Sequence, residues 1–306
     1  MHLCTCTLDG EVVVGLVAGP RVVNLSRALG LSPHQGMIDL ITRWAEFKDT
    51  LQTWRDTLLS EPEGGVSASL DPSCLHKLDE AHLLAPVPRP GKALAIGLNY
   101  LEHVNEQIIG EVRTPPEHQI WFPKLSTAIH APFDPIVLPR VSGMTDYEGE
   151  MVAVIGQRCR HVPPERAHEV VFGYAVGNDV SVRDFQKRTS QWTLGKSFDT
   201  HAPYGPWITT ADEVPDPHAL SLRTWVNGEL RQSSHTSLMI HNLWSQIAQL
   251  TQVMTLEPGD IIFTGTCAGV GAASNPPKFL RHGDTVRVEI ESLGAIVARC
   301  EDEAAD

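Results

Sequence analysis

The feature that most constrains the fold is a series of short apolar segments from residue 92 onward, which Gly, Pro and Asp residues separate. Segments of this length are typical of β-strands and are too short for most helices. They cover residues 93–96, 136–138, 151–155, 170–176, 261–264 and 286–290. The clearest helical pattern in this region covers residues 238–250. We therefore predict that residues 86–306 form a mainly β domain of the α+β class.

The first 85 residues are predicted to form a separate small α/β domain. Two β-rich runs, 11–17 and 21–25, are joined through Gly19 and Pro20, which predicts a hairpin. Apolar residues then recur at spacings of three and four, which predicts one amphipathic helix. These residues are Met37, Leu40, Ile41, Trp44, Phe47, Leu51, Trp54 and Leu58.

Two further stretches are predicted to lie outside regular elements. Residues 61–72 are rich in Gly, Ser and Pro and predict a loop, which a stiff connector with Pro86, Pro88 and Pro90 follows. The acidic residues 301–306 predict a frayed C-terminal tail.

The composition argues against several classes of protein. The 24 Lys and Arg residues against 37 Asp and Glu residues give a net charge of -13, which disfavours nucleic-acid binding. No apolar run is long enough for a membrane span, and residues 1–9 lack the pattern of a secretory signal. The six Cys residues show no spacing typical of metal or redox sites. We therefore expect a cytoplasmic protein with reduced thiols.

Two carboxylates, Glu148 and Glu150, precede the apolar run 151–155. In a strand, residues i and i+2 point to the same face, so the two side chains are expected side by side. Buried carboxylates repel each other unless a cation compensates them, and oxygen ligands suit Mg²⁺, Mn²⁺ or Ca²⁺. One hypothesis is therefore a divalent-cation site. The alternative is a solvated strand end with Tyr147 directed inward.

Asp179 and Lys196 add to the first hypothesis. Asp179 follows the apolar run 170–176, and Lys196 stands among small and aromatic residues. A buried lysine near carboxylates and a cation can fix a substrate carboxylate or stabilise an enolate. Its alternative role is a structural salt bridge to Asp184 or Asp199.

His103 and Glu106 form a candidate general base. If residues 97–106 are helical, the i, i+3 spacing places both side chains on one face. A histidine that a carboxylate holds can deprotonate water. The alternative is a surface helix with ordinary polar residues.

Together these elements resemble the fumarylacetoacetate hydrolase superfamily, and most of all its branch of acylpyruvate hydrolases and oxaloacetate decarboxylases. The resemblance covers roughly residues 92–298, with the motifs in the same order. The matching segments are GLNYLEHVNE, FPKLSTAI, DYEGEMVAVIG, GYAVGNDVSVRDFQ, QWTLGKSFDTHAPYGPWI, VNGELRQ, MIHNLW, LEPGDIIFTGT and GVG. The resemblance implies a mixed β-sandwich roll, a smaller N-terminal domain and usually a homodimer.

The resemblance also implies roles for single residues. The expected ligands of one Mg²⁺ or Mn²⁺, with Ca²⁺ as a further option, are Glu148, Glu150 and Asp179. The expected catalytic residues are His103 and Glu106, which match the dyad of a mobile lid, and Lys196, which matches a substrate-facing lysine. The expected substrate-binding residues are Lys124, Arg183, Gln186 and Thr266.

Four residues depart from the family pattern. Cys267 stands where the TGT turn normally continues with Pro, and His201 follows SFDT, where an apolar residue is more common. His235 and His241 replace residues that are commonly Asn and Phe. None of these changes removes an expected metal ligand, so they bear on the substrate and on the shape of its pocket.

The first hypothesis for the function is divalent-metal-dependent C–C bond cleavage of a β-dicarbonyl 2-oxo acid. Acylpyruvate hydrolysis and oxaloacetate-type decarboxylation both pass through a metal-bound enolate. The alternative is an isomerase, tautomerase or dehydratase that acts on an enolisable acid in a catabolic or specialised-metabolite pathway. A third class, a catalytically idle scaffold or binding protein, has no need of the dyad. A small-molecule acid is the expected partner, without nucleic acid or membrane.

Overall fold

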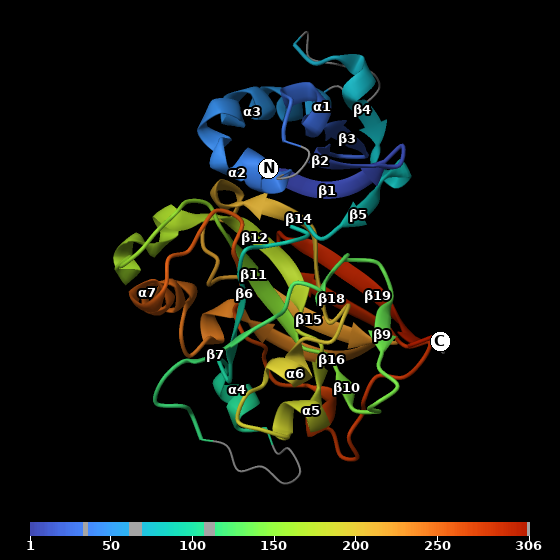
Figure 1. The fold of residues 1–306 in the computed structure, drawn as a ribbon, viewed down its shortest axis with the longest axis vertical. Coiled ribbons are helices and arrows are strands. Elements are labelled where there is room, and N and C mark those ends of the chain that lie inside the picture. Colours follow the sequence, from blue (N-terminus) through green and yellow to red (C-terminus); the bar gives the residue numbers. More distant parts are fainter. Residues whose placement is uncertain (33–35, 61–68, 107–113, 305–306) are drawn as a thin grey trace.

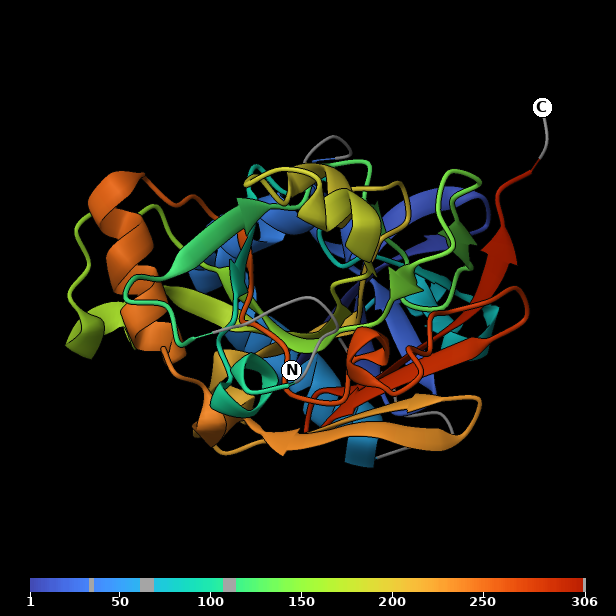
Figure 2. The ribbon, with the colours of Figure 1, turned by 90° about the horizontal axis from the view of Figure 1, so that it is seen from below.

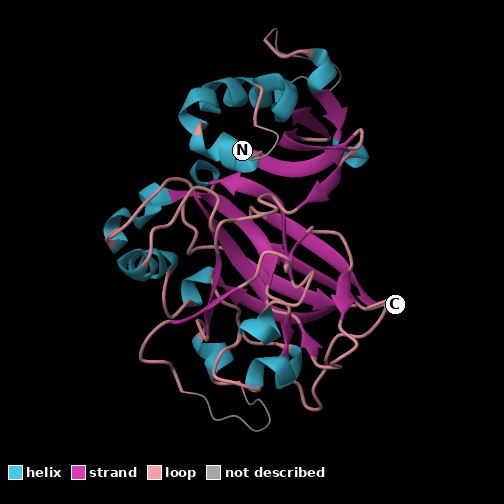
Figure 3. Ribbon diagram, viewed as in Figure 1, coloured by secondary structure: helices cyan, strands magenta, loops and turns pink. Residues whose placement is uncertain are grey.

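The architecture consists of β-sheets with helices packed around them (Figure 3), in a computed structural model that describes residues 1–32, 36–60, 69–106 and 114–304. The strands of these residues form one large mixed sheet, a five-stranded sheet and a two-stranded pair. The prediction of a mainly β fold of the α+β class is therefore confirmed.

The elements follow one another along the chain as labelled in Figure 1. The strands are β1 His2–Leu8, β2 Glu11–Ala18, β3 Arg21–Asn24, β4 Leu75–Lys77, β5 His82–Leu84, β6 Ala93–Gly97, β7 Ile120–Pro123, β8 Ile129–His130, β9 Ile136–Leu138, β10 Thr145–Asp146, β11 Gly149–Ile155, β12 Val171–Asn178, β13 Ser181–Val182, β14 Ala202–Thr210, β15 Ser221–Val226, β16 Glu229–His235, β17 Ile261–Phe263, β18 Thr285–Ile290 and β19 Gly294–Asp302. The α-helices are α1 Leu25–Leu29, α2 Met37–Thr42, α3 Trp44–Ser60, α4 Leu101–Val104, α5 Arg183–Lys187, α6 Thr193–Lys196 and α7 Leu243–Val253.

The large sheet connects the N-terminal strands to the rest of the chain. Its order is β4-β3-β2-β1-β14-β12-β11-β17-β6-β7, and the antiparallel pair β1–β14 joins the two parts. Figure 1 shows the N-terminal strands and helices at one end of the long axis, and α4, α5 and α6 at the other. In the view from below, these three short helices lie toward the viewer (Figure 2). The domain boundary at residue 85 stays a prediction.

The central strand β11 is buried along its whole length, and its two faces contact different cores. Met151, Ala153 and Ile155 pack in a core with residues of β18 and β19. Val152 and Val154, on the other face, pack in the core that also contains the N-terminal helices. This position between two cores explains why the segment is apolar without alternation.

The predicted N-terminal hairpin is present, and the predicted helix differs from the observed helices at one position. β2 and β3 form the predicted hairpin, in which Ala18 pairs with Arg21. The predicted single helix is two helices, α2 and α3, which Arg43 separates. The residues predicted from the spacing nevertheless reach one core, because Leu40 of α2 and Leu51 of α3 both pack there.

Two other boundaries also differ from the prediction. The pattern over residues 238–250 predicted a helix, but α7 begins only at Leu243, where the Asn242 side chain caps it by accepting from the Ser245 N–H. The predicted frayed tail is wrong for Glu301 and Asp302, because these residues pair with Val137 and Leu138 of β9. The predicted loop at 61–72 lies mostly outside the described residues.

All six cysteines are free. Within the described residues, no helix has both the length and the apolar character that a membrane crossing requires.

The proline-rich connector is fixed by a buried tyrosine of β14. The Tyr204 hydroxyl donates to the Val87 carbonyl at 2.9 Å and accepts from the Val87 N–H at 2.7 Å. Both groups of this one residue in the connector are therefore satisfied by a single side chain, which is itself fully buried.

We predict that Tyr204→Phe lowers the free energy of unfolding by about 1–3 kcal/mol, because it leaves buried backbone groups of Val87 without a partner. Urea denaturation of the wild type and the variant measures this difference. Tyr174→Phe is the matched control, since Tyr174 is equally buried in β12 and no hydrogen bond of its hydroxyl is found within the described residues. Equal stabilities of the two variants would contradict the prediction.

Candidate active site

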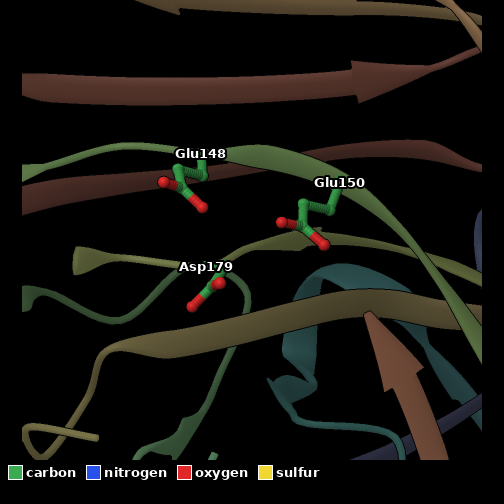
Figure 4. Close-up of side chains that lie close together, drawn as sticks. All are labelled: Glu148, Glu150 and Asp179. Atoms are coloured by element: carbon green, nitrogen blue, oxygen red, sulfur yellow. The ribbon is translucent and has the colours of Figure 1, made fainter. Parts of the chain in front are cut away.

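Three buried carboxylates meet at the adjoining ends of β11 and β12. Glu148 directly precedes β11, Glu150 is the second residue of that strand, and Asp179 directly follows β12. One oxygen of each carboxylate lies within 4.8 Å of the others. Figure 4 shows the three side chains directed toward one another. We call these three residues the acidic cluster.

The strand register brings these residues together. Gly149 of β11 pairs with Asn178 of β12, so the residues just outside the pair, Glu148 and Asp179, lie opposite each other. The Asp179 N–H donates to the Glu148 carbonyl at 2.9 Å, and the Glu148 N–H donates to Asn178 Oδ1 at 2.9 Å. Alternation along β11 then places Glu150 on the same side as Glu148.

The acidic cluster has the donor set that a divalent cation requires. Mg²⁺ and similar ions bind oxygen ligands at about 2.0–2.1 Å, which places ligand oxygens about 3.0 to 4.2 Å apart. The spread of 4.8 Å or less among the carboxylate oxygens matches this range after small side-chain adjustments. The cluster can therefore hold a divalent cation through Glu148, Glu150 and Asp179.

Two lysine ammonium groups pair with the acidic cluster. Lys196, at the end of α6, donates to Glu148 Oε2 and Asp179 Oδ2, both at 2.7 Å. Lys124 Nζ lies 2.6 Å from Asp179 Oδ1 and donates to the Val180 carbonyl at 3.1 Å. Both lysines are buried, so their charges act in a region that water screens weakly.

Arg183 binds the carboxylate oxygen of Glu148 that Lys196 does not bind. Its guanidinium donates to Glu148 Oε1 at 2.6 Å and to Asp146 Oδ2 at 2.8 Å. It also donates to Gln186 Oε1 at 3.1 Å. These contacts orient the Glu148 carboxylate; the expected contacts of Arg183 and Gln186 with substrate stay predictions.

The balance of charges affects the members of the cluster differently. Burial raises the pKa of Glu150 well above its usual value, and the charges of Asp179 and Glu148 add to the effect. Burial acts on Glu148 too, but Lys196 and Arg183 outweigh it and lower its pKa. Among the described residues, no lysine or arginine forms an ion pair with Glu150. An added cation would therefore relieve the strongest repulsion at this residue.

The lysines also differ from each other. Burial would lower the pKa of Lys196, but Asp179 and Glu148 outweigh it and raise the value. At Lys124 burial dominates over the attraction of Asp179, and the pKa is lowered. Lys196 is thus the more firmly charged of the two.

The loop formed by residues 264–271 lies beside the acidic cluster and contacts Glu150. The Gly265 N–H donates to Glu150 Oε2 at 2.7 Å, and Gly265 has a φ of 96°, which favours glycine. The Thr266 hydroxyl donates to the Gly149 carbonyl at 2.9 Å and accepts from Gln232 Nε2 at 2.8 Å. Thr266 thus fixes the loop to β11, and its expected contact with substrate stays a prediction.

His103 and Glu106, the predicted dyad, contact each other. His103 is in α4, and its Nδ1 lies 2.6 Å from Glu106 Oε2. The other oxygen, Glu106 Oε1, accepts from the Gly269 N–H of loop 264–271. Because Gly265 of the same loop binds Glu150, loop 264–271 contacts both the dyad and the acidic cluster.

Three residues that hold the site together were not predicted from the sequence. Asp146 accepts from the Gly271 and Ala272 N–H groups as well as from Arg183. Asn99 binds the Thr264 carbonyl at 2.7 Å. The third residue is Gln232, which donates to the Thr266 hydroxyl and the Cys267 carbonyl. Asp146, Asn99 and Gln232 are all buried. The available signal was their position inside the segments DYEGEMVAVIG, GLNYLEHVNE and VNGELRQ.

The four departures from the family pattern have separate surroundings. Burial lowers the pKa of His201 to about 3, and its Nε2 contacts the Val137 carbonyl at 2.9 Å. His235 contacts the Ser237 hydroxyl, and the His241 N–H donates to Asn99. Cys267 is buried, and its carbonyl accepts from Gln232. These hydrogen bonds do not involve the carboxylates of the acidic cluster.

Comparison with known families confirms the resemblance predicted from the sequence. The family model described as fumarylacetoacetate (FAA) hydrolase C-terminal matches residues 92–301. The match begins just before β6 and ends within β19, so it includes every residue of the acidic cluster and the dyad.

Individual relatives cover still more of the chain. This chain is 42% identical over 266 residues to the mitochondrial oxaloacetate tautomerase Fahd2a of Rattus norvegicus. The match covers 86% of this chain and 83% of the relative. Maleylpyruvate hydrolase from Sphingobium sp. SYK-6, whose structure contains manganese(II) and pyruvate, has a TM-score of 0.79 at 32% identity and covers 99% of this chain and 100% of its own. A 5-carboxymethyl-2-hydroxymuconate delta-isomerase from Mycobacterium smegmatis has a TM-score of 0.74 at 32% identity, with the same coverage.

One prediction from the sequence requires correction. We expected a cytoplasmic protein, but the oxaloacetate tautomerases of Rattus norvegicus, Bos taurus and Homo sapiens that this chain resembles are mitochondrial proteins. The expectation rested on composition and on the lack of a secretory pattern in residues 1–9, and neither distinguishes the cytoplasm from the mitochondrion.

We predict that Glu150→Ala weakens the binding of Mn²⁺ by at least about 100-fold, because it removes one of three charged ligands. Isothermal titration calorimetry of the purified protein with MnCl₂ measures the affinity. Glu301→Ala, which removes an exposed carboxylate on β19, is the control and is expected to bind Mn²⁺ as the wild type does. Unchanged affinity in Glu150→Ala would exclude Glu150 as a ligand.

Proposed function

Because the chain belongs to the fumarylacetoacetate hydrolase family of enzymes, we propose that it acts on a 2-oxo acid with a β-carbonyl group, with the help of a divalent cation. The observation that carries this proposal is that one loop, 264–271, contacts both the dyad and the acidic cluster. Gly265 of loop 264–271 binds Glu150, and Gly269 of the same loop binds Glu106. A general base and a cation site are thus held in one arrangement.

We propose that the reaction is the interconversion of the keto and enol forms of an oxaloacetate-type acid. The 42% identity to an oxaloacetate tautomerase over 86% of the chain supports this choice over C–C cleavage, which the sequence had placed first. The reaction requires a base that removes a proton next to a carbonyl and returns it to another atom. The dyad has the residue types for this task.

Each group has a defined part in this proposal. The cation, when bound, stabilises the negative charge that develops on the 2-oxo oxygen. His103 takes the proton from the carbon between the carbonyl groups, and Glu106 stabilises the positive charge that His103 then carries. Lys196 donates to the substrate carboxylate, for which its position between Glu148 and Asp179 is suited. Buried surroundings strengthen these interactions, because few water molecules compete with them.

The charges of the site favour an anionic substrate. The three negative charges of the acidic cluster face the two positive charges of Lys124 and Lys196. Arg183 and Asp146 form a further pair that is neutral as a whole. A bound divalent cation would therefore leave one positive charge in excess, which a carboxylate of the substrate neutralises.

A second candidate is hydrolysis of the C–C bond of an acylpyruvate. The observation in its favour is the dyad itself, because a histidine beside a carboxylate can activate water as well as move a substrate proton. The likeness to maleylpyruvate hydrolase at a TM-score of 0.79 also supports it. Both reactions use the same acidic cluster and differ in whether water attacks.

We predict that the wild-type protein with Mg²⁺ or Mn²⁺ accelerates the ketonisation of enol-oxaloacetate. The loss of the enol absorbance measures this reaction, and proton NMR of the same samples detects pyruvate. Proton NMR of separate samples with acylpyruvates detects pyruvate together with a carboxylic acid. Faster ketonisation without pyruvate supports the tautomerase, whereas pyruvate and an acid from an acylpyruvate would support the hydrolase. No effect on any of these substrates would overturn the proposed function.

We predict that Glu106→Gln slows turnover by about 100-fold or more and leaves the Mn²⁺ affinity unchanged, because the dyad loses its negative charge but the acidic cluster stays intact. Steady-state kinetics and calorimetry measure the two quantities. Glu102→Gln, at an exposed position of α4, the helix that carries His103 and ends two residues before Glu106, is the control with the same change of charge. Equal rates of the two variants would show that Glu106 is not part of the reaction.

A further inference from the structure

Gly269 connects the dyad to the remainder of the site. Its N–H donates to Glu106 Oε1, while Glu106 Oε2 contacts His103 Nδ1. Its carbonyl accepts from the Tyr147 hydroxyl at 2.9 Å. The orientation of this one residue therefore affects whether its N–H points at Glu106.

The backbone at Gly269 requires glycine. Its φ of 107° is a conformation that other residues rarely adopt. A Cβ atom at this position would also lie 2.0 Å from the Arg231 carbonyl oxygen, which is backbone and cannot move easily. The absence of a side chain allows the two peptide groups on either side of the Gly269 Cα to rotate unless other contacts fix them. The Tyr147 hydroxyl fixes the second of these groups through its carbonyl.

Tyr147 itself is firmly placed. It stands between Asp146 and Glu148 in the sequence and is 1% exposed. Asp146 accepts from the Gly271 and Ala272 N–H groups at 2.7 and 3.0 Å, so two neighbouring residues bind the same loop. A tyrosine hydroxyl has a pKa of about 10, so at neutral pH it carries the proton that it donates to the Gly269 carbonyl.

We propose that Tyr147 is a positioning residue for the dyad of His103 and Glu106, and that it acts through the backbone of Gly269, whose carbonyl and N–H lie on either side of its Cα. The proposal rests on the proposed function, in which the dyad moves a proton. The hydroxyl of Tyr147 fixes the Gly269 carbonyl, the Gly269 N–H fixes Glu106, and Glu106 orients the imidazole. Tyr147 does not touch the reacting atoms, so its removal affects the rate and not the affinity for substrate or cation.

The first test uses Tyr147→Phe, which removes the hydroxyl and keeps the ring. We expect kcat to fall about 3- to 10-fold, which corresponds to the loss of one hydrogen bond, with KM and the Mn²⁺ affinity unchanged. Tyr174→Phe is the matched control: Tyr174 is buried in β12, where it pairs with Ala153 and Thr209, and we expect no change in kcat. Thermal melting of both variants shows that each is folded.

A second measurement separates positioning from a general structural effect. Glu106→Ala removes the side chain that Gly269 holds, so Tyr147→Phe is expected to cause no further loss of kcat in this background. If Tyr147 acted only on the stability of the site, the same 3- to 10-fold loss would occur in both backgrounds, and the proposal would be overturned.

A third measurement does not depend on turnover. An ionised carboxylate only accepts hydrogen bonds, so Nδ1 of His103 carries the proton in its contact with Glu106. Proton NMR of protein with ¹⁵N-labelled histidine follows this proton, and its loss in His103→Asn assigns the signal. We expect about 3- to 10-fold faster exchange with solvent in Tyr147→Phe than in the wild type or Tyr174→Phe.

The measurements distinguish the two proposals. A wild type without activity on the tested acids would overturn the proposed function, while the exchange of the His103 proton would still decide the role of Tyr147. Unchanged exchange in Tyr147→Phe would overturn the positioning role, even if the enzyme is an active tautomerase.

Discussion

The antiparallel pairing of β11 with β12 is the constraint on which the rest of the site depends, because it buries three carboxylates next to one another. Burial of each charge costs several kcal/mol unless opposite charges and hydrogen bonds compensate it. Lys196 and Arg183 compensate Glu148, and both lysines contact Asp179. Among the described residues, the one hydrogen-bond donor to Glu150 is the Gly265 N–H, which carries no full charge. The negative charge of Glu150 is therefore not compensated, and a cation can bind there.

Loop 264–271 connects the acidic cluster with the dyad, because backbone groups of the loop contact both. Gly265 and Gly269 each present an N–H to a carboxylate, and both have positive φ angles. Backbone donors are fixed by the fold and lose little entropy when they bind. The dyad is therefore placed relative to the cluster by a short stretch of main chain and not by long, flexible side chains.

The sequence predicted the parts of this site that follow from local spacing. Alternation in a strand placed Glu148 beside Glu150, and the i, i+3 spacing placed His103 beside Glu106. The contact of Tyr147 with Gly269 could not be predicted, because it joins residues far apart in the sequence through the packing of two segments. The end of α2 at Arg43 was not predicted, because the apolar spacing continues across Arg43 although the helical backbone conformation is interrupted there.

Both candidate reactions depend on the position of the general base. Proton transfer and attack by water both require a base within hydrogen-bond reach of its target, and a displacement of about 1 Å can cost about 100-fold in rate. The backbone between Gly265 and Gly269 contacts both the cluster and the dyad and so helps to fix their separation. The ligands and the base are common to both reactions. In the proposed mechanisms, the two reactions differ in whether a water molecule attacks the β-carbonyl or His103 only moves a proton of the substrate.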